Sequence, residues 1–503
     1  MEPLYFSFFT LILTAFLVFV LATRRKARNL PGPRGLPFIG SIHELPQENV
    51  WKVYSDWAAK YGGIFAFKVF NRQIVVINSI SIATELIDKR ARLYSDRPDL
   101  ALIPLLGWGF DLAFMRIHDP RYRPYRKIIA QQFSRRIQKF EEVQLAECRA
   151  ALFAILYNPA DLFLLVNHFA ASVILKTTYG QELGQNKRLV HLATEAVDVL
   201  SERVFFGAQL LYAFPLLRHL PWWAPVPGAG IKRFARNNTA TVAEMVDLPI
   251  ELLQNSLKAG GDIPCWATNL LQQDSETSVA DIKAVTATSY AAGIHTAESC
   301  MKSFLLAMVL HPHCQELAQA EIDRVIGSGR LPSFEDRSQL PYVSALCREI
   351  FRWHPPVPLG VAHATSEDDI YDGYFIPKGS AVVANIWGMS RDANLFEDSN
   401  SFKPERFLKH GQLSDDPCDF IFGFGRRICP GQHYTLATVW LFVVSVLSVF
   451  TISKAKNESG EDIEVEERYT STGLISQPLP FPYSISPRTS QAQMLIEQTQ
   501  NTS

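Results

Sequence analysis

Residues 422–431 constrain this chain more than any other segment, because they set a cysteine just ahead of a long apolar run. They read Phe-Gly-Phe-Gly-Arg-Arg-Ile-Cys-Pro-Gly, and the apolar run extends from Thr435 to Phe450. The run predicts a buried helix, so we expect Cys429 close to the free backbone N–H groups of the helix N-terminus. Such N–H groups and nearby arginines lower the pKa of a thiol and stabilise the thiolate.

The glycines of this segment predict an unusual backbone beside the cysteine. Gly425 and Gly431 would allow left-handed geometry and the close approach of a flat partner, and a thiolate held in this way suits haem iron. The segment resembles the haem-binding loop of the cytochrome P450 family. The residues at the fixed positions of that loop are Phe422, Gly425, Arg427, Cys429 and Gly431. The resemblance implies that they bind haem b, with Cys429 as the axial ligand of the iron.

The same resemblance implies further contacts to the anionic propionates of the haem. Arg126 matches the arginine of the family's Trp-x-x-x-Arg helix, and Tyr122 stands in place of the tryptophan. His363 follows the segment 356–360, where the family usually has another propionate ligand. A phenol can donate a hydrogen bond, so Tyr122 could still serve. For Tyr122 and His363, ordinary packing roles remain the alternative.

A long helical pattern from Ser278 to Leu310 is interrupted by residues 292–297, which read Ala-Gly-Ile-His-Thr-Ala. In the family this stretch reads Ala-Gly-x-acid-Thr-Thr, and its acid and alcohol deliver protons while dioxygen is cleaved. Thr296 is therefore expected to orient oxygen, and His295 takes the place of the acid. An imidazole with a pKa of about 6.5 carries protons at neutral pH. We hypothesise that His295 replaces the acid in this relay.

Two alternatives to that relay remain open. His295 could make an ordinary hydrogen bond while water supplies the protons. The chemistry could also be altered, for example to a rearrangement or a dehydration, because Ala297 replaces the family's second threonine.

A Glu-x-x-Arg pair, Glu349 and Arg352, lies in a predicted helix from Pro341 to His354. Residues at this spacing share a helix face, so their side chains can pair. The order of these residues and of Arg406 resembles the family's structural triad. We interpret all three as structural residues.

The N-terminus predicts a membrane anchor. From Pro3 to Thr23 there is no charged residue, and about 20 such residues cross a bilayer. The basic flank 24–28 then places the rest of the chain in the cytosol. We expect residues 1–29 to be a single-pass transmembrane helix with its flank, in the endoplasmic reticulum membrane. A cleaved signal peptide is the alternative.

The resemblance covers residues 30–485 and implies the prism-shaped fold of the family, mainly α with small peripheral β-sheets. Residues 30–37 predict a stiff proline-rich hinge, and residues 64–77 predict a β-hairpin. The polar tail 486–503 is predicted to be disordered.

Charge and cysteine content exclude some classes of protein. The net charge is −1, whereas a nucleic-acid-binding domain would need a basic surface, so we expect no nucleic-acid partner. The seven cysteines are odd in number and scattered, which favours a reducing compartment over a disulfide framework.

The resemblance implies an O₂-dependent haem-thiolate monooxygenase that hydroxylates a hydrophobic small molecule, of the kind found in fungal secondary-metabolite pathways. The chain has no dinucleotide-binding fingerprint, so its electrons are expected from NADPH through an NADPH–cytochrome P450 reductase. The pocket is expected to be lined by residues 100–115, 291–296, 357–361 and 472–475. Alternatives are desaturation, ring formation or rearrangement, and a non-catalytic haem or ligand binder.

Overall fold

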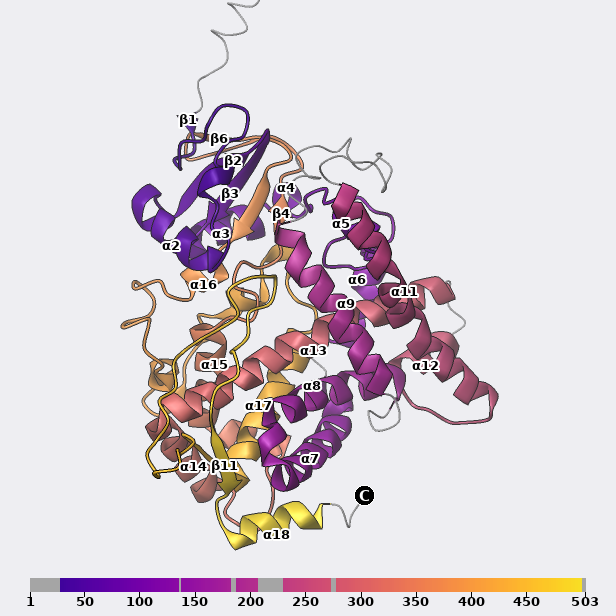
Figure 1. The fold of residues 1–503 in the computed structure, drawn as a ribbon, viewed down its shortest axis with the longest axis vertical. Coiled ribbons are helices and arrows are strands. Elements are labelled where there is room, and N and C mark those ends of the chain that lie inside the picture. Colours follow the sequence, from indigo (N-terminus) through magenta and orange to yellow (C-terminus); the bar gives the residue numbers. More distant parts are fainter. Residues whose placement is uncertain (1–27, 135–136, 182–186, 207–228, 273–276, 500–503) are drawn as a thin grey trace, which may run out of the picture.

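Helices form most of the molecule, and the larger sheets gather at one end of it (Figure 1). The protein is described from a computed structural model, which covers residues 28–134, 137–181, 187–206, 229–272 and 277–499. The predicted transmembrane helix falls in residues 1–27 and lies outside the described residues. The described residues thus have the many helices and small sheets that the resemblance to the family predicted.

The helices in the first half of the chain are short around residues 80–105 and longer afterwards. They are α2 (Val50–Tyr61), α3 (Ile80–Ala83), α4 (Ala91–Tyr94), α5 (Leu102–Leu105), α6 (Tyr122–Gln132), α7 (Glu141–Tyr157), α8 (Leu162–Tyr179), α9 (Lys187–Phe206) and α11 (Ala229–Lys258). Those that follow are α12 (Trp266–Gln272), α13 (Val279–Leu310), α14 (Pro312–Val325), α15 (Pro341–Trp353), α16 (Ile386–Met389), α17 (Gln432–Val449) and α18 (Ser490–Gln498).

The strands form small separate sheets. The largest sheet has the order β2 (Ile64–Val69), β3 (Arg72–Ile77), β7 (Ala381–Ala384), β4 (His363–Ala364). The predicted hairpin is confirmed as the antiparallel pair β2–β3, and β3 then pairs in parallel with β7. The other sheets are β1 (Arg28–Asn29) with β6 (Tyr374–Ile376) and β5 (Asp369–Tyr371), β8 (Leu408–Lys409) with β9 (Gln412–Leu413), and β10 (Phe450–Ser453) with β11 (Ser484–Pro487).

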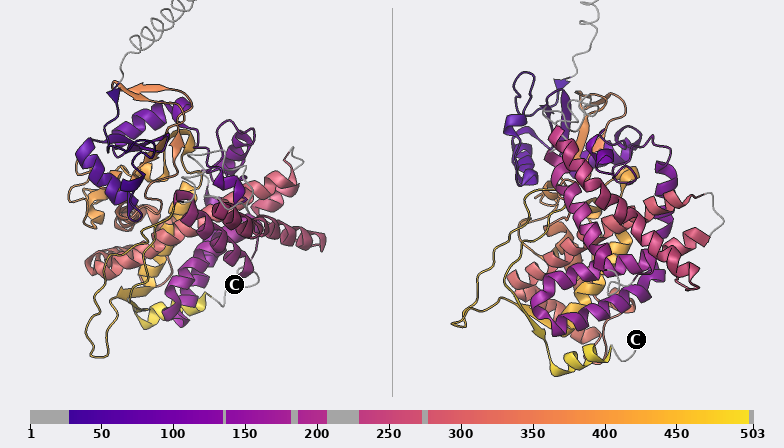
Figure 2. Two further views of the ribbon diagram at one scale, coloured as in Figure 1. Left: turned by 45° about the horizontal axis from the view of Figure 1, so that its top comes forward. Right: turned by 45° about the vertical axis from the view of Figure 1, so that its right-hand side comes forward.

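Helix α13 runs through the middle of the helical body and packs against α8 and α17 (Figures 1 and 2). Its N-terminus is capped by Ser278, whose hydroxyl accepts the backbone N–H of Asp281 at 3.1 Å. It ends before Pro312, which cannot continue the ladder of hydrogen bonds. The predicted interruption at residues 292–297 is wrong, because the helix is continuous there. A Cβ added at Gly293 would lie 3.0 Å from Cγ1 of Ile174 in α8, so the close packing of the two helices favours glycine there.

Helix α17 is the buried apolar helix that the run after Cys429 predicted. Gly431 is its N-cap, and almost every residue from Tyr434 to Val449 is buried. Among the described residues, α17 and the segment Pro159–Tyr179 are long and apolar enough to span a membrane. Both are largely buried by the rest of the protein, as core helices are.

The proline-rich segment 30–37 is attached to the body of the protein. Leu30 is buried, and the carbonyl of Pro31 accepts the backbone N–H of Ala66 at 2.8 Å. At Gly32 an added Cβ would lie 1.9 Å from the carbonyl oxygen of Ala66. At least its first residues therefore extend the edge of β2.

The prediction of a disordered tail from residue 486 is wrong for the described residues up to 499. Residues 484–487 form β11, which pairs with β10, and α18 follows. Thr489 caps α18 by accepting the N–H of Ala492. Ala492 and Ile496 are buried and join the main core. Two apolar side chains four residues apart thus anchor a helix whose other positions are mostly polar.

Candidate functional site

The loop before α17 holds Cys429 in a tight backbone arrangement. The N–H of Cys429 donates to the carbonyl of Phe422 at 2.8 Å and closes the loop. Gly425 has a φ of +54°, and a Cβ there would lie 2.6 Å from the carbonyl oxygen of Ile87. The predicted left-handed glycine is therefore confirmed at Gly425. It is wrong at Gly431, which has a φ of −88° as the N-cap of α17.

The predicted lowering of the Cys429 pKa is also wrong for the thiol in its protein surroundings. Burial raises the pKa of this thiol, and this effect outweighs the backbone N–H groups of Gly431 and Gln432 and the charge of Arg126. Removal from water destabilises a thiolate by more than one helix N-terminus stabilises it. A coordinated metal ion deprotonates a thiol outright, so the raised pKa is compatible with a ligand role.

Arg427 lies inside the loop and donates to three carbonyl oxygens. Its Nε donates to Ser95 at 2.8 Å, and its two terminal nitrogens donate to Met115 at 2.8 Å and Leu112 at 3.3 Å. The guanidinium carbon also lies 4.0 Å from the ring centroid of Tyr122. The Tyr122 hydroxyl donates to the carbonyl of Arg426 at 3.1 Å. In this structure Tyr122 thus holds the loop, and its contact to a cofactor stays a prediction.

A second buried arginine, Arg97, belongs to this site and was missed by the sequence analysis. Its Nε donates to the carbonyl of Ala113 at 2.7 Å, and one terminal nitrogen donates to Val361 at 2.6 Å and Ala362 at 2.9 Å. Burial and the charge of Arg427 lower the pKa of Arg97 to about 9. Nothing local to residue 97 signals this role, because its partners lie far along the chain.

Three positive charges converge here without a carboxylate partner. Within the described residues, Arg97, Arg126 and Arg427 form no ion pair, and Nη2 of Arg97 has no hydrogen-bond acceptor. The charge of Arg126 opposes the larger effect of burial on the pKa of Cys429, and it adds to burial in lowering the pKa of Arg427. Arg97 is buried, and a buried cation normally has an anionic partner. Unpaired guanidinium groups beside a cysteine therefore fit a cofactor that carries carboxylates and a thiolate-binding metal.

His363 lies in β4 beside these arginines. Its Nδ1 is 2.7 Å from the carbonyl of Tyr94, so this nitrogen carries a proton. Burial and the charges of Arg97 and Arg427 lower the pKa of His363 well below its ordinary value. The neutral ring therefore offers only a lone pair at Nε2. It can donate to an anion there only if that anion offsets the two arginine charges.

Thr296 and His295 occupy different surroundings on α13. Thr296 is partly exposed, and its hydroxyl donates to the carbonyl of Ala292 at 2.8 Å. His295 is buried, with Nδ1 3.2 Å from Oε2 of Glu298. No hydrogen bond joins the His295 and Thr296 side chains in the described part of the chain.

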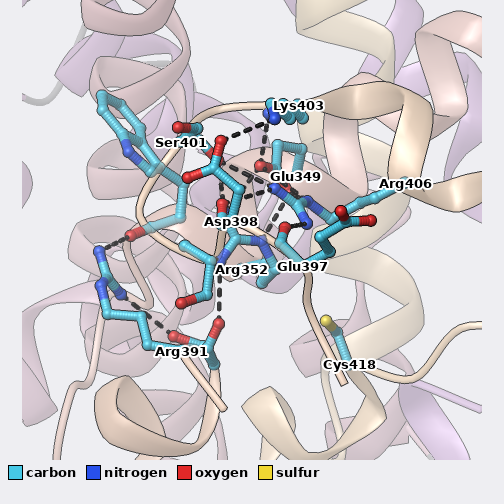
Figure 3. Close-up of polar contacts among 12 residues, drawn as sticks. Glu349, Arg352, Arg391, Glu397, Asp398, Ser401, Lys403, Arg406 and Cys418 are labelled. Atoms are coloured by element: carbon cyan, nitrogen blue, oxygen red, sulfur yellow. Dashed lines mark hydrogen bonds and ion pairs between the residues drawn. The ribbon is translucent and has the colours of Figure 1, made fainter. Parts of the chain in front are cut away.

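The predicted structural triad is confirmed (Figure 3). Arg352 donates to both carboxylate oxygens of Glu349, at 2.6 and 2.7 Å, and Arg406 reaches the same carboxylate at 3.2 Å. Both members of the Glu349–Arg352 pair are fully buried. Arg352 also donates to carbonyl oxygens of residues 390, 399 and 401, so the pair fastens this segment to α15.

A largely apolar cavity of about 380 Å³ adjoins Arg97. It is lined by three of the predicted segments, with Leu100, Trp108, Phe114, Leu359, Val361 and Leu474 among the lining residues. The predicted segment 291–296 does not line it. The cavity lies toward α2 and the largest sheet, whose residues Tyr54 and Ile74 complete its wall.

Comparison with known proteins agrees with this site. The sequence model of the family described as "Cytochrome P450" matches residues 30–484. The chain belongs to the cytochrome P450 family. The matched range covers nearly the same residues as the resemblance seen in the sequence, which spans residues 30–485.

Several fungal cytochromes P450 resemble the chain over nearly its whole length. Cytochrome P450 monooxygenase 208 of Postia placenta is 39% identical over 495 residues, which cover 96% of each chain. Cytochrome P450 monooxygenase COX1 of Coprinopsis cinerea is 36% identical and covers 93% of this chain and 94% of its own. Cytochrome P450 monooxygenase ppsD of Aspergillus oryzae is also 36% identical, with 97% and 94% covered.

Membership in the cytochrome P450 family makes the chain an oxidoreductase of the monooxygenase type. The family implies haem with a cysteine thiolate ligand. The donor set of this site, a cysteine beside arginines that form no ion pair within the described residues, fits that cofactor.

Proposed function

We propose that the protein is a membrane-anchored haem-thiolate monooxygenase that oxidises a hydrophobic small molecule with O₂ and electrons from NADPH. The observation that carries this proposal is Cys429 at the N-terminus of α17, beside arginines that have no carboxylate partner among the described residues. Cys429 would ligate the iron, and Arg97, Arg126 and Arg427 would bind the propionates. Phe422, Gly425, Gly431, Tyr122 and His363 complete the proposed cofactor site.

When bound, haem with a thiolate ligand supplies the chemistry of dioxygen activation. The chain's own task is to bind substrate, limit water and supply protons. We assign the hydroxyl of Thr296 to orienting the oxygen species and the imidazole of His295 to holding and passing protons. The Thr296 hydroxyl is partly exposed on α13, as this role requires.

The substrate is proposed to be hydrophobic, because the wall of the cavity beside Arg97 is largely apolar and includes several Leu, Ile, Phe, Trp and Val side chains. A fungal secondary metabolite fits this chemistry, and the relatives of this chain come from fungi. Hydroxylation is the simplest reaction. Desaturation, ring formation or rearrangement is the second candidate, favoured by His295 and Ala297 at positions where the family has an acid and a threonine. The mass of the product distinguishes them, because hydroxylation adds one oxygen atom.

Electrons are proposed to come from an NADPH–cytochrome P450 reductase, since the sequence has no nicotinamide- or flavin-binding fingerprint. The apolar run before residue 24 supports a single-pass anchor in the endoplasmic reticulum membrane, with the haem domain in the cytosol.

The carbon monoxide difference spectrum of the reduced, membrane-expressed protein tests the haem-thiolate assignment. We expect a strongly red-shifted Soret band that is lost in Cys429→Ser. Cys265→Ser is the matched control, because Cys265 is buried elsewhere and a hydroxyl can keep its hydrogen bond with Thr268. A band that survives in Cys429→Ser would refute the assignment of the ligand.

A further inference from the structure

His295 belongs to a buried polar network that joins α13 to α8. Its Nδ1 lies 3.2 Å from Oε2 of Glu298, and Nζ of Lys302 lies 2.6 Å from Oε1 of the same carboxylate. Asn167 of α8 donates its Nδ2 hydrogen to Oε2 of Glu298 at 2.9 Å. The side chains of His295, Glu298 and Lys302 are 9%, 5% and 13% exposed.

The spacing of these residues explains how one helix brings them together. Positions 295, 298 and 302 lie three and four residues apart, so their side chains follow one face of α13. Asn167 shows that this face is turned toward α8. The Glu298 carboxylate is therefore held from three directions, and its position along the helix is fixed.

The charge of Glu298 determines which nitrogen of His295 carries the proton. Burial opposes ionisation, but the hydrogen bond from His295 and the charge of Lys302 lower the pKa of Glu298 to about 2. At neutral pH the group is a carboxylate, which only accepts hydrogen bonds. Nδ1 of His295 must then be protonated, and in the neutral ring Nε2 carries the lone pair.

Nε2 of His295 is the unusual atom of the network. It is buried and has no hydrogen-bond partner within the described residues. Leaving a buried polar atom unpaired costs about 1–3 kcal/mol, so such atoms in native proteins call for an explanation. The lone pair at Nε2 is therefore free to accept a hydrogen bond or a proton from a donor beside it.

The network also lies close to solvent. Asn167 lines a cleft of about 700 Å³ between α8 and α9, whose other lining residues include His168, His191 and Glu195. One hydrogen bond thus separates this polar cleft from the Glu298 carboxylate.

We propose that Glu298 is the positioning residue of His295, holding the ring with Nδ1 protonated and the Nε2 lone pair free to take up a proton. The inference rests on the proposed function of His295. A proton from water binds Nε2 while the Nδ1–H hydrogen bond to Glu298 persists. Release of that proton for the reduction of dioxygen restores the neutral ring. Glu298 stays ionised and Lys302 stays charged throughout, so the network is neutral at rest, carries one positive charge while Nε2 holds the proton, and is neutral again after its release.

The test measures how the full-length enzyme, with a cytochrome P450 reductase and NADPH, partitions dioxygen between water and hydrogen peroxide in the absence of substrate. Cleavage of dioxygen to water consumes more protons than its release as hydrogen peroxide. We expect His295→Ala and Glu298→Gln each to lower water formation relative to hydrogen peroxide by roughly 10-fold or more. The double variant should be no worse than His295→Ala, because the two residues act as one unit.

Controls separate this role from a structural one. Asp247→Asn breaks the 2.7 Å ion pair to Lys283, which also joins α13 to another helix, and should leave the partition unchanged. Glu298→Gln keeps an oxygen that can accept from Nδ1, so its effect reports the charge. Each variant must first show the red-shifted carbon monoxide band. If Glu298→Gln lacks this band, Asn167→Leu is used in its place, and we expect a smaller change of the partition in the same direction.

The outcomes are distinguishable. An unchanged partition in His295→Ala would refute the proton role of His295, which is part of the proposed function. The positioning role alone would be overturned if the partition changed in His295→Ala but stayed unchanged in Glu298→Gln. Where Asn167→Leu replaces Glu298→Gln, an unchanged partition in Asn167→Leu would have the same meaning. Additive losses in the double variant would also overturn it, since independent residues do not share one proton path.

Discussion

Replacing Arg97 tests whether the unpaired guanidinium groups are the anion site for the cofactor. Arg97 is buried next to the apolar cavity, and its Nη2 has no hydrogen-bond acceptor within the described residues. Arg97→Met keeps much of the apolar stem and removes the charge. A hydrogen bond to a charged group contributes about 1.5–3 kcal/mol. At about 1.4 kcal/mol per tenfold, loss of that bond should weaken haem binding by roughly 10- to 150-fold.

The assay is transfer of haem to an excess of apomyoglobin, followed by the Soret absorbance. It should be run well below the unfolding temperature, because Arg97→Met also leaves the carbonyl of Ala113 without its donor. Arg97→Lys is expected to be intermediate, since it keeps the charge without the planar fork. Arg121→Met is the matched control. Arg121 lines the same cavity, but its charge is already paired with Asp119 at 2.8 Å. A haem-transfer rate equal to that of the unmodified protein in Arg97→Met would refute the assignment of the anion site.

Three further predictions follow from other parts of the structure. Glu349→Gln leaves the buried Arg352 without its counter-charge and should lower the free energy of unfolding by about 3–5 kcal/mol, measured as a loss of folded haem protein on heating. The control Asp323→Asn, at a surface ion pair with Arg488, should lower it by at most about 1 kcal/mol. Equal losses in the two variants would contradict the reasoning. Burial raises the pKa of Asp111 from 3.8 to about 7, so the folded chain retains a proton that the unfolded chain releases, and stability should fall by up to about 4 kcal/mol between pH 4 and pH 8. Asp111→Asn should remove that part of the pH dependence in denaturant titrations, and an unchanged slope would count against it. Ending the chain after Arg488 removes the buried Ile496 of α18 and should lower the free energy of unfolding by roughly 2–3 kcal/mol; no change would mean that α18 contributes nothing to the core.

The parts of the fold that the sequence predicted correctly have strong local signals. The hairpin β2–β3 has two runs rich in β-branched and aromatic residues on either side of a short turn. Helix α13 begins at a serine cap and ends at a proline, and α17 is one uninterrupted apolar run. Propensity, capping and proline chemistry determine such elements without help from distant residues.

The parts that were missed depend on contacts between distant segments. The partners of Arg97 at residues 361 and 362 lie more than 260 positions away, so its burial is invisible in the sequence. The break predicted in α13 rested on the likeness of residues 292–297 to a family pattern, and the helix is continuous through them. The Cys429 pKa was predicted from the helix N-terminus and the neighbouring arginines, whereas burial dominates it.

Two missed features did have a local signal. Glu298 follows His295 by three residues and precedes Lys302 by four, a spacing that predicts side-chain contact on any helix. Thr489, Ala492 and Ile496 likewise have the spacing of a capped amphipathic turn. The polar composition of the tail concealed it.

The pairing of distant segments has a consequence for biosynthesis. Strand β3 pairs with β7, about 300 residues later, and the hydroxyl of Tyr157 in α7 donates to Glu497 of α18 across 340 positions. A ribosome that has completed α7 must add most of the remaining chain before these partners exist. Nascent chains therefore spend most of their synthesis with unpaired strand edges and exposed apolar faces, the surfaces that chaperones recognise and that aggregate. Yield from heterologous expression should consequently respond more to translation rate and chaperone supply than to the stability of the finished fold.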